Sequence, residues 1–464
     1  MTFVSAGRIR PSPALRPVVA ALALALGTGL AQAQSLVDVY AAARGYDPTY
    51  LGARALADSA QYRAEQAHAG RRPGLNLVVS GTHAVNNTPD SLPTSAGSTT
   101  IDGRLAAQQS LFNRPLDLQI DQADKGIDAA RASLQLAEQD LIVRVAQAYF
   151  DVLSSAEALT SVQANEKAIE QQLASAKRNF EVGNATITDT REAEARYDLA
   201  RAQEIAARND LETKKVTLDQ LVGRNGVAPQ PLAAPVVLPA VLPSQASDWV
   251  RMAEADNASL KLAQLNYEVA KLTTSEKRAG HLPTVGLTAG YVRSHAQQNF
   301  SNALVCRDGQ CQIVSGDSRA NTNGGSIAVT VTVPLFAGYA IENRVKEAVL
   351  LEEKARNDFE TAHSAATLGT RTAFLGAQSG SAQVKALEAA EVSSKLALEA
   401  TELGYKVGVK VNIDVLNAQS QLYQTRRDLA KARYDYLLAT LKLRQAAGQL
   451  KADDLLAINA LLAR

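Results

Sequence analysis

An internal duplication constrains the possible folds of this chain more than any other feature of its sequence. Residues 179–183 (NFEVG) return as residues 404–408 (GYKVG), an offset of 225. Residues 110–112 (SLF) return as residues 334–336 (PLF), an offset of 224. Because both pairs keep nearly the same offset, the chain consists of two long halves with one plan, and not of a series of short repeats.

Both halves contain stretches in which apolar and polar residues alternate. Val329 and Val331 alternate with Thr330 and Thr332, which is the period of a β-strand. The same period recurs over residues 75–80, 101–111 and 284–291. The longest of these stretches, residues 101–111, has 11 residues, and about 10–12 residues is the length that a tilted strand needs to cross a bilayer. A small soluble sheet with one buried face is the alternative, but the sequence offers no further element to cover these faces.

We therefore predict one β-hairpin in each half. The first repeat covers residues 34–227 with a hairpin over 74–112, and the second covers 244–464 with a hairpin over 283–336. A Pro-rich linker over 228–243 separates them, and it cannot form a regular helix. Polar loops are expected between the paired strands, over residues 86–99 and 294–325.

Most of the remaining sequence has the pattern of long helices. Residues 115–180 and 339–405 carry Ala and Leu at three- and four-residue steps, without interior Pro, as antiparallel coiled coils do. A run of about 65 residues forms a helix about 100 Å long. Further helices are predicted over residues 36–71, 189–222, 248–280 and 414–447.

The first 33 residues have the pattern of a cleaved signal peptide. Arg8, Arg10 and Arg16 precede an apolar stretch over residues 18–30, and residues 31–33 (AQA) form a cleavage site. The apolar stretch is too short to span a bilayer as a helix. Cleavage leaves 45 basic against 47 acidic residues, so the mature chain lacks the basic surplus of nucleic-acid-binding proteins. We predict an exported protein with no nucleic-acid partner.

No constellation of residues typical of an enzyme competes with this interpretation. The five histidines are scattered without metal-ligand spacing, and neither a Gly-rich phosphate loop nor a nucleophile elbow is present. We predict no catalytic residue, metal or cofactor. Cys306 and Cys311, in the stretch CRDGQC, are expected to form a disulfide that closes a loop, with a redox or metal site as the alternative.

The strand count limits how such a chain could sit in a membrane. Four strands cannot close a transmembrane barrel, and open strand edges are not tolerated in lipid, so several copies would have to share one barrel. An eight-stranded barrel fills its own interior, whereas a wider one leaves a channel. The fold class predicted is an α+β membrane channel in which a long antiparallel coiled-coil barrel continues a transmembrane β-barrel.

Several ordered motifs resemble the TolC family of outer-membrane efflux proteins. They are residues 35–40 (SLVDVY) with Asp47 and Pro48, 180–183 (FEVG), 281–283 (HLP), 333–338 (VPLFAG), and 405–408 (YKVG) followed by 414–416 (DVL). The resemblance covers nearly the whole mature chain. Gln34, and not Cys, directly follows the predicted cleavage site, which resembles the non-lipidated branch of the family.

The resemblance implies a homotrimer with a twelve-stranded barrel in the outer membrane and a helical barrel in the periplasm. It also implies docking to a periplasmic adaptor (membrane fusion) protein and to an inner-membrane pump or ABC transporter, in drug efflux or type I protein secretion. A soluble periplasmic coiled-coil adaptor or scaffold is the alternative function.

The alternation within the strands predicts which residues face the lumen and which face lipid. The lumen-facing residues are Asp102, Arg104, Gln108, Thr330 and Thr332, and the lipid-facing residues are Ile327, Val329 and Val331.

Both copies of a Val-Gly pair lie where a long helix ends and the next begins. Gly183 and Gly408 suit the left-handed position that follows a helix. By the resemblance, these turns form the periplasmic tip, where Val182, Gly183, Val407 and Gly408 would contact the adaptor. The alternative is that they only end the helices.

The resemblance also places the channel's gate near this tip. Asp414, Asn417 and Gln421 lie on one helix face, and the family's equivalent face lines the narrowest part of the entrance. In the family the first two positions are acidic, so Asn417 departs from the pattern and implies a less negative ring.

Four further residues are implied to hold the entrance closed. Thr188 and Asp189 are expected to bond Tyr405 and Lys410 across the neighbouring coils. The alternative is that Asp189 and Asp414 merely stabilise the N-termini of their helices, where carboxylates are favoured.

Overall fold

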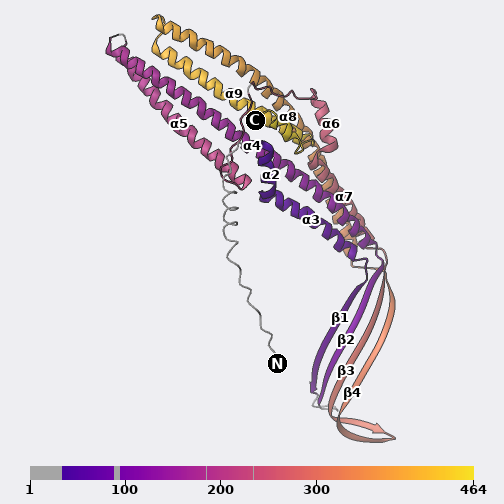
Figure 1. The fold of residues 1–464 in the computed structure, drawn as a ribbon. Helices are drawn as coiled ribbons and strands as arrows, with labels where there is room; N and C mark the ends of the chain where they lie inside the picture. Colours follow the sequence, from indigo (N-terminus) through magenta and orange to yellow (C-terminus); the bar gives the residue numbers. More distant parts are fainter. Residues whose placement is uncertain (1–33, 88–94, 184, 234, 464) are drawn as a thin grey trace, which may run out of the picture. The chain divides into compact units, whose positions relative to one another are not determined.

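The computed structural model describes residues 34–87, 95–183, 185–233 and 235–463; the predicted signal peptide lies outside them. In the first half the elements are α2 (Leu36–Tyr46), α3 (Pro48–Ala69), β1 (Gly74–Asn87), β2 (Ser95–Phe112), α4 (Arg114–Glu181) and α5 (Ile187–Val222). In the second half they are α6 (Ala246–Asp256), α7 (Ala258–Ala279), β3 (Thr284–Arg307), β4 (Gln310–Thr332), α8 (Ala340–Lys406), α9 (Asn412–Ala446) and α10 (Asp454–Asn459) (Figure 1). Apart from α10, the two halves repeat one order of elements, as the duplication predicts.

Each short helix predicted before a hairpin is divided into two. Helix α2 ends at Tyr46 and α3 begins at Pro48, since proline lacks an N–H and keeps the residue before it out of the helical conformation. The intervening Asp47 accepts a hydrogen bond from the Tyr50 N–H at 2.8 Å. In the second half, Asn257 separates α6 from α7, and its Nδ2 donates to the Ala446 carbonyl at 2.8 Å.

The four strands form one antiparallel sheet in the order β1-β2-β3-β4, so β2 and β3 join the two halves (Figure 1). Across the sheet, Leu75 lies opposite Ala107, Ala107 opposite Ala289, and Ala289 opposite Ile327. Directly paired residues point to the same side of a sheet. The apolar positions of all four strands therefore share one face, and this face is open, with Leu75 66% and Ile327 80% exposed.

The opposite face carries the residues predicted to face the lumen. The register places Asp102, Arg104 and Gln108 on the same side as Thr330 and Thr332. The alternation read from the sequence thus agrees with the register of every strand pair.

The strands are longer than predicted. Strands β3 and β4 have 24 and 23 residues, and they pair through most of the segment expected to be a polar loop over residues 294–325. That prediction was wrong because antiparallel pairing satisfies the backbone whether side chains are polar or apolar. The actual turn is Asp308-Gly309, where both residues have positive φ angles, an Asp-Gly hairpin signal present in the sequence. In the first half, β1 reaches Asn87 and β2 begins at Ser95, which shortens the other predicted loop.

A bulge interrupts the alternation near the end of β2. Phe112, and not Leu111, lies opposite Val285, because the β2–β3 register shifts between Ser110 and Phe112. Leu111 is the extra residue that a bulge leaves without a direct partner.

Two compact units divide the chain, and each draws residues from both repeats. The first contains Ala137–Asn257, Ala366–Arg464 and the described residues up to Leu51, and the second contains Gly52–Leu136 and Ala258–Ala365. The first unit has aromatic side chains at equivalent places of the two repeats. Phe150 stacks on Tyr434, with ring centroids 5.7 Å apart, and Phe374 packs with Trp249 and Leu443.

Within the residues described, no helix has both the length and the apolar composition that a membrane-spanning helix needs. The linker over residues 228–243 is irregular where it is described, as its prolines predict.

Candidate functional site

The two helix reversals that carry the Val-Gly pairs lie side by side. Helix α4 ends at Glu181 and α8 ends at Lys406, and Asn179 Nδ2 donates to the Tyr405 hydroxyl at 3.3 Å. Gly183 and Gly408 have φ angles of 80° and 79°. Both glycines therefore adopt the left-handed conformation that ends a helix, as their sequence positions predict.

Several aliphatic side chains are exposed at these reversals, beside the exposed charged residues Glu181 and Lys406. Val182 is 69% exposed and Val407 is 66% exposed. Ile187, Val409 and Val411, which flank the turns, are also exposed. A cluster of exposed aliphatic side chains at one end of a helical unit is typical of a surface that contacts another protein. We call these five side chains the apolar tip.

The structure gives Asp189 a different partner from the one predicted. Its Oδ2 accepts hydrogen bonds from the N–H of Thr186 at 3.0 Å and from the hydroxyl of Thr186 at 2.8 Å. The Asp189 N–H donates in return to Thr186 Oγ1 at 3.2 Å, which completes a capping box at the start of α5. The Tyr405 hydroxyl bonds to Asn179, and not to Asp189. Asp189 bonds to Thr186, three residues away, in place of the distant Tyr405, because the local capping box gives helix N–H groups the acceptors that they would otherwise lack.

Lys410 also bonds elsewhere than predicted. Its Nζ lies 3.5 Å from Asp414 Oδ2, four residues further along the chain, instead of contacting Thr188. Asp414 lies in the first turn of α9, so its carboxylate is near both the helix N-terminus and a lysine.

The predicted constriction residues do share a face of α9. Asp414 is half-buried, whereas Asn417 and Gln421 are exposed. Arg196 of α5 donates from Nη2 to Asn417 Oδ1 at 3.2 Å. Arg196 was not among the predicted site residues, although it lies seven residues after Asp189 and so falls on the same face of its helix.

The packing beneath this face fixes where α9 begins. Leu416 packs in a buried cluster with Ile169 and Leu173 of α4 and Ala193 of α5. Asn412, at the first position of α9, is buried and hydrogen-bonded to Gln172 of α4. The turn that carries Asp414 is therefore held by contacts between the two halves of the chain.

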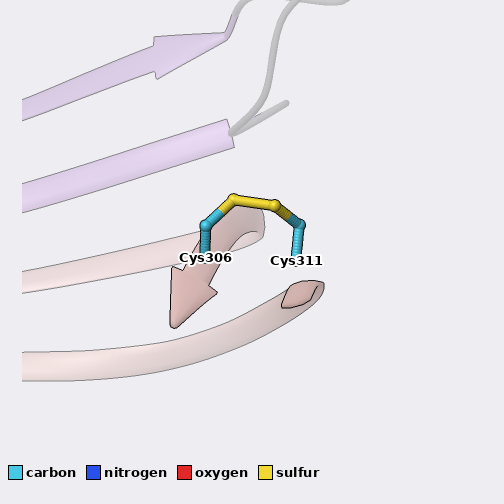
Figure 2. Close-up of a disulfide and its surroundings, with 2 residues drawn as sticks. All are labelled: Cys306 and Cys311. Carbon is cyan, nitrogen blue, oxygen red and sulfur yellow. A yellow bond between two sulfur atoms is a disulfide. The ribbon is translucent and has the colours of Figure 1, made fainter. Parts of the chain in front are cut away.

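The predicted cysteine pair lies far from this site in the sequence, at the turn between β3 and β4. Cys306 and Cys311 pair across the end of the hairpin and are joined by a disulfide (Figure 2). The bridge encloses the Asp308-Gly309 turn.

Comparison with known proteins identifies the family. The sequence profile of the family described as "Outer membrane efflux protein" matches residues 39–224 and 249–449, which is most of the chain. The chain belongs to the outer membrane efflux protein family. The outer membrane protein TolC of Vibrio cholerae is 30% identical over 96% of this chain and 98% of its own length. TolC of Escherichia coli strain K12 is 31% identical over 97% of this chain and 89% of its own length.

Solved structures show the same fold at lower identity. The outer membrane protein VceC of Vibrio cholerae aligns with a TM-score of 0.72 and 20% identity, over 89% of this chain and 96% of its own. Members of the family are channels and not enzymes. This member is accordingly an outer-membrane efflux channel protein that extends into the periplasm.

Proposed function

We propose that three copies of the chain form one channel-tunnel that exports substrates across the outer membrane, docked to a periplasmic adaptor and an inner-membrane pump or transporter. The observation that carries the proposal is the sheet. Among the described residues, β1 and β4 each pair along one edge only, and the apolar face of the sheet is open. Such a sheet is incomplete in lipid, where every backbone group needs a partner.

Closure by identical copies satisfies those edges without a change in topology. Because the sheet has four antiparallel strands, β1 and β4 run in opposite directions. The β4 edge of one copy can therefore continue antiparallel onto the β1 edge of the next. Two copies would give eight strands, which fill their own interior, whereas three give twelve and leave a lumen lined by the polar face.

The trimer can be tested by a cross-link between the two outer strands. Ser80 of β1 and Ser326 of β4 both lie on the polar face. We expect a Ser80→Cys, Ser326→Cys protein treated with a flexible bismaleimide to run as a covalent trimer on heated gels. The native cysteines are already joined as a disulfide and should not react. Either single variant should give no ladder, and a double variant that runs only as monomer would contradict the shared barrel.

We further propose that the apolar tip is the adaptor-docking surface, with Val182, Gly183, Val407 and Gly408 at its centre. A side chain added at either glycine would extend into open space, so substitutions there alter the surface without a clash. Both asparagine and aspartate tolerate a positive φ angle, so they form a matched pair that differs only in charge.

Gly183→Asp and Gly408→Asp should therefore abolish co-purification with the adaptor, because desolvating a charge in an apolar contact is unfavourable. Gly183→Asn and Gly408→Asn should retain most of it, and all four proteins should remain trimeric. Equal adaptor recovery with the Asp and Asn variants would leave these residues with the helix-ending role alone.

The third part of the proposal concerns the entrance. Asp414, Asn417 and Gln421 share a face of α9, and we place them at the constriction, held by Lys410 and Arg196 instead of by Asp189. Asp414→Asn should shift the reversal potential in a salt gradient towards anion preference, because it removes one negative charge per chain. An unchanged reversal potential would exclude Asp414 from the permeation path.

A further inference from the structure

A polar groove lies beside the predicted constriction, between α4, α5 and α9. Its volume is about 400 Å³. Asn417 and Gln421 line it on one side, so the groove and the predicted constriction share two side chains. Arg196 of α5 and Arg427 of α9 also line it. Among the residues described there, these two arginines are the charged ones, and no carboxylate lines the groove.

The acceptors of these two arginines are neutral. Arg196 donates to Asn417 Oδ1 at 3.2 Å, and Arg427 donates to Gln424 Oε1. Neither arginine forms an ion pair within the described part of the chain. Nearby arginines behave differently: Arg426 Nε lies 3.0 Å from Glu391 Oε1. Two guanidinium charges therefore border this groove without a carboxylate to neutralise them.

The floor of the groove contains a second unusual group. Asn165 of α4 lines it and is 8% exposed, yet its Oδ1 has no hydrogen-bond partner among the described residues. Val162 and Ile169 precede and follow it on the same helix face and are buried apolar residues. A buried amide oxygen without a partner costs about 1–3 kcal/mol relative to a satisfied one, so a donor that reaches it would stabilise a bound state.

We propose that this groove binds an organic anion that also carries hydroxyl groups, as part of the substrate path through the entrance. Guanidinium groups recognise carboxylate and phosphate through charge-assisted hydrogen bonds. The amides of Gln203 and Asn165 and the hydroxyl of Ser420 offer partners for hydroxyl groups. The place of this site on the export path rests on the proposed channel function, whereas binding in the groove does not.

Glucose 6-phosphate is a suitable probe because it joins an anion to several hydroxyls. We expect the detergent-solubilised full-length protein to bind it in titration calorimetry, to bind inorganic phosphate more weakly, and not to bind glucose. Arg196→Gln combined with Arg427→Gln should weaken glucose 6-phosphate binding by about tenfold or more. Arg191→Gln is the matched control, because Arg191 lies on the same helix, pairs with Glu194 and does not line the groove.

A third variant separates the anion from its hydroxyls. Asn165→Leu should weaken the binding of glucose 6-phosphate and leave that of inorganic phosphate unchanged. Thermal unfolding of each variant identifies any that fails to fold. For Asn165→Leu the two ligands are compared on the same protein sample, so a partial loss of folded protein affects both measurements equally.

Three results of these binding experiments would overturn the proposal. One is no binding of glucose 6-phosphate by the wild-type protein up to about 10 mM. Another is equal binding by the wild type and the double arginine variant. The third is a double arginine variant that no longer forms trimers but still binds glucose 6-phosphate. That result would assign the groove to contact between copies.

Planar bilayers then test the path separately. Glucose 6-phosphate added on the side of the helix reversals should reduce the current through the wild type but not through the double variant. If the protein binds the probe and forms no conducting pores, the channel proposal fails and the binding site stands. If pores conduct and the probe blocks wild type and double variant equally, the site in the groove fails and the channel stands.

Discussion

Two adjacent residues of β4 give the sharpest test of the membrane arrangement. Val329 lies in the middle of the apolar positions Ile327 to Val331, opposite Leu287, and is 62% exposed in the single chain. Thr330 follows it on the polar face, opposite Gly286. If the apolar face contacts lipid, Val329→Arg places a guanidinium in the hydrocarbon, whereas Thr330→Arg places it in water. Both variants introduce one arginine, at nearly the same position along the strand.

The cost of the first variant follows from its depth. An arginine on the lipid face of a barrel costs about 2–4 kcal/mol near the bilayer midplane and about 0–1 kcal/mol near the interface. Each of three copies carries the substitution, and sites this far apart add, so the trimer would lose about 6–12 kcal/mol. Thr330→Arg should cost little, because the residue opposite is a glycine and leaves room for the longer side chain.

Folding into lipid vesicles over a urea series measures the difference, with the unheated trimer band as the readout. We expect Val329→Arg to lower the urea midpoint strongly or to prevent trimer formation. Thr330→Arg should fold like the wild type and change the single-channel conductance. Equal midpoints for the two variants would refute the lipid assignment, and a reversed order would mean that the two faces of the sheet have been exchanged.

Two further predictions concern the helical unit. Arg144→Met should lower the free energy of unfolding in urea by about 3–5 kcal/mol, because it leaves the buried Asp47 carboxylate without its two hydrogen bonds from Arg144, of 2.8 and 3.1 Å. Asp47→Asn should cost less, because the Arg144 side chain that it leaves behind is partly exposed. Arg144 holds the pKa of Asp47 below its ordinary value. The stabilisation is therefore present above about pH 4 and is lost as the pH falls through the folded-state pKa of Asp47. The difference in unfolding free energy between wild type and Arg144→Met should accordingly narrow in acid. At the tip, Tyr405→Phe should raise the conductance in planar bilayers, because it removes the hydroxyl that bonds to Asn179. Asp189→Ala should only destabilise the start of α5, by about 1 kcal/mol. Equal leaks from the two variants would instead favour a bond between Asp189 and Tyr405.

The repeating features of this fold could be read from the sequence because they depend on period and on backbone conformation. Alternation placed Val329 and Thr330 on opposite faces, and the register of all four strands agrees. The glycines at 183 and 408 predicted helix ends, because a left-handed residue is needed there and glycine adopts that conformation without a steric penalty.

Strand length could not be read in the same way. The pattern of side chains ends where the apolar band ends, but backbone pairing continues to the Asp308-Gly309 turn. Hydrophobic periodicity reports which side of a sheet is covered, and carries no information on how far an exposed polar hairpin extends beyond it. The Asp-Gly pair was the one local signal for the true turn.

The two reversals at the tip show why side-chain partners were harder to predict than the backbone. Helix α5 begins with a capping box, so its start is set by residues close together in sequence. Helix α9 begins after Val411, which supplies no side-chain cap. Its start is held instead by the bond between Asn412 and Gln172, 240 residues apart. Duplicated motifs therefore share a turn conformation, while the forces that fix each turn differ. Asn417 belongs to the helix whose start depends on distant contacts, and its partner Arg196 lies in the other repeat. Their contact followed from the packing of α5 against α9, which no spacing within either repeat could reveal.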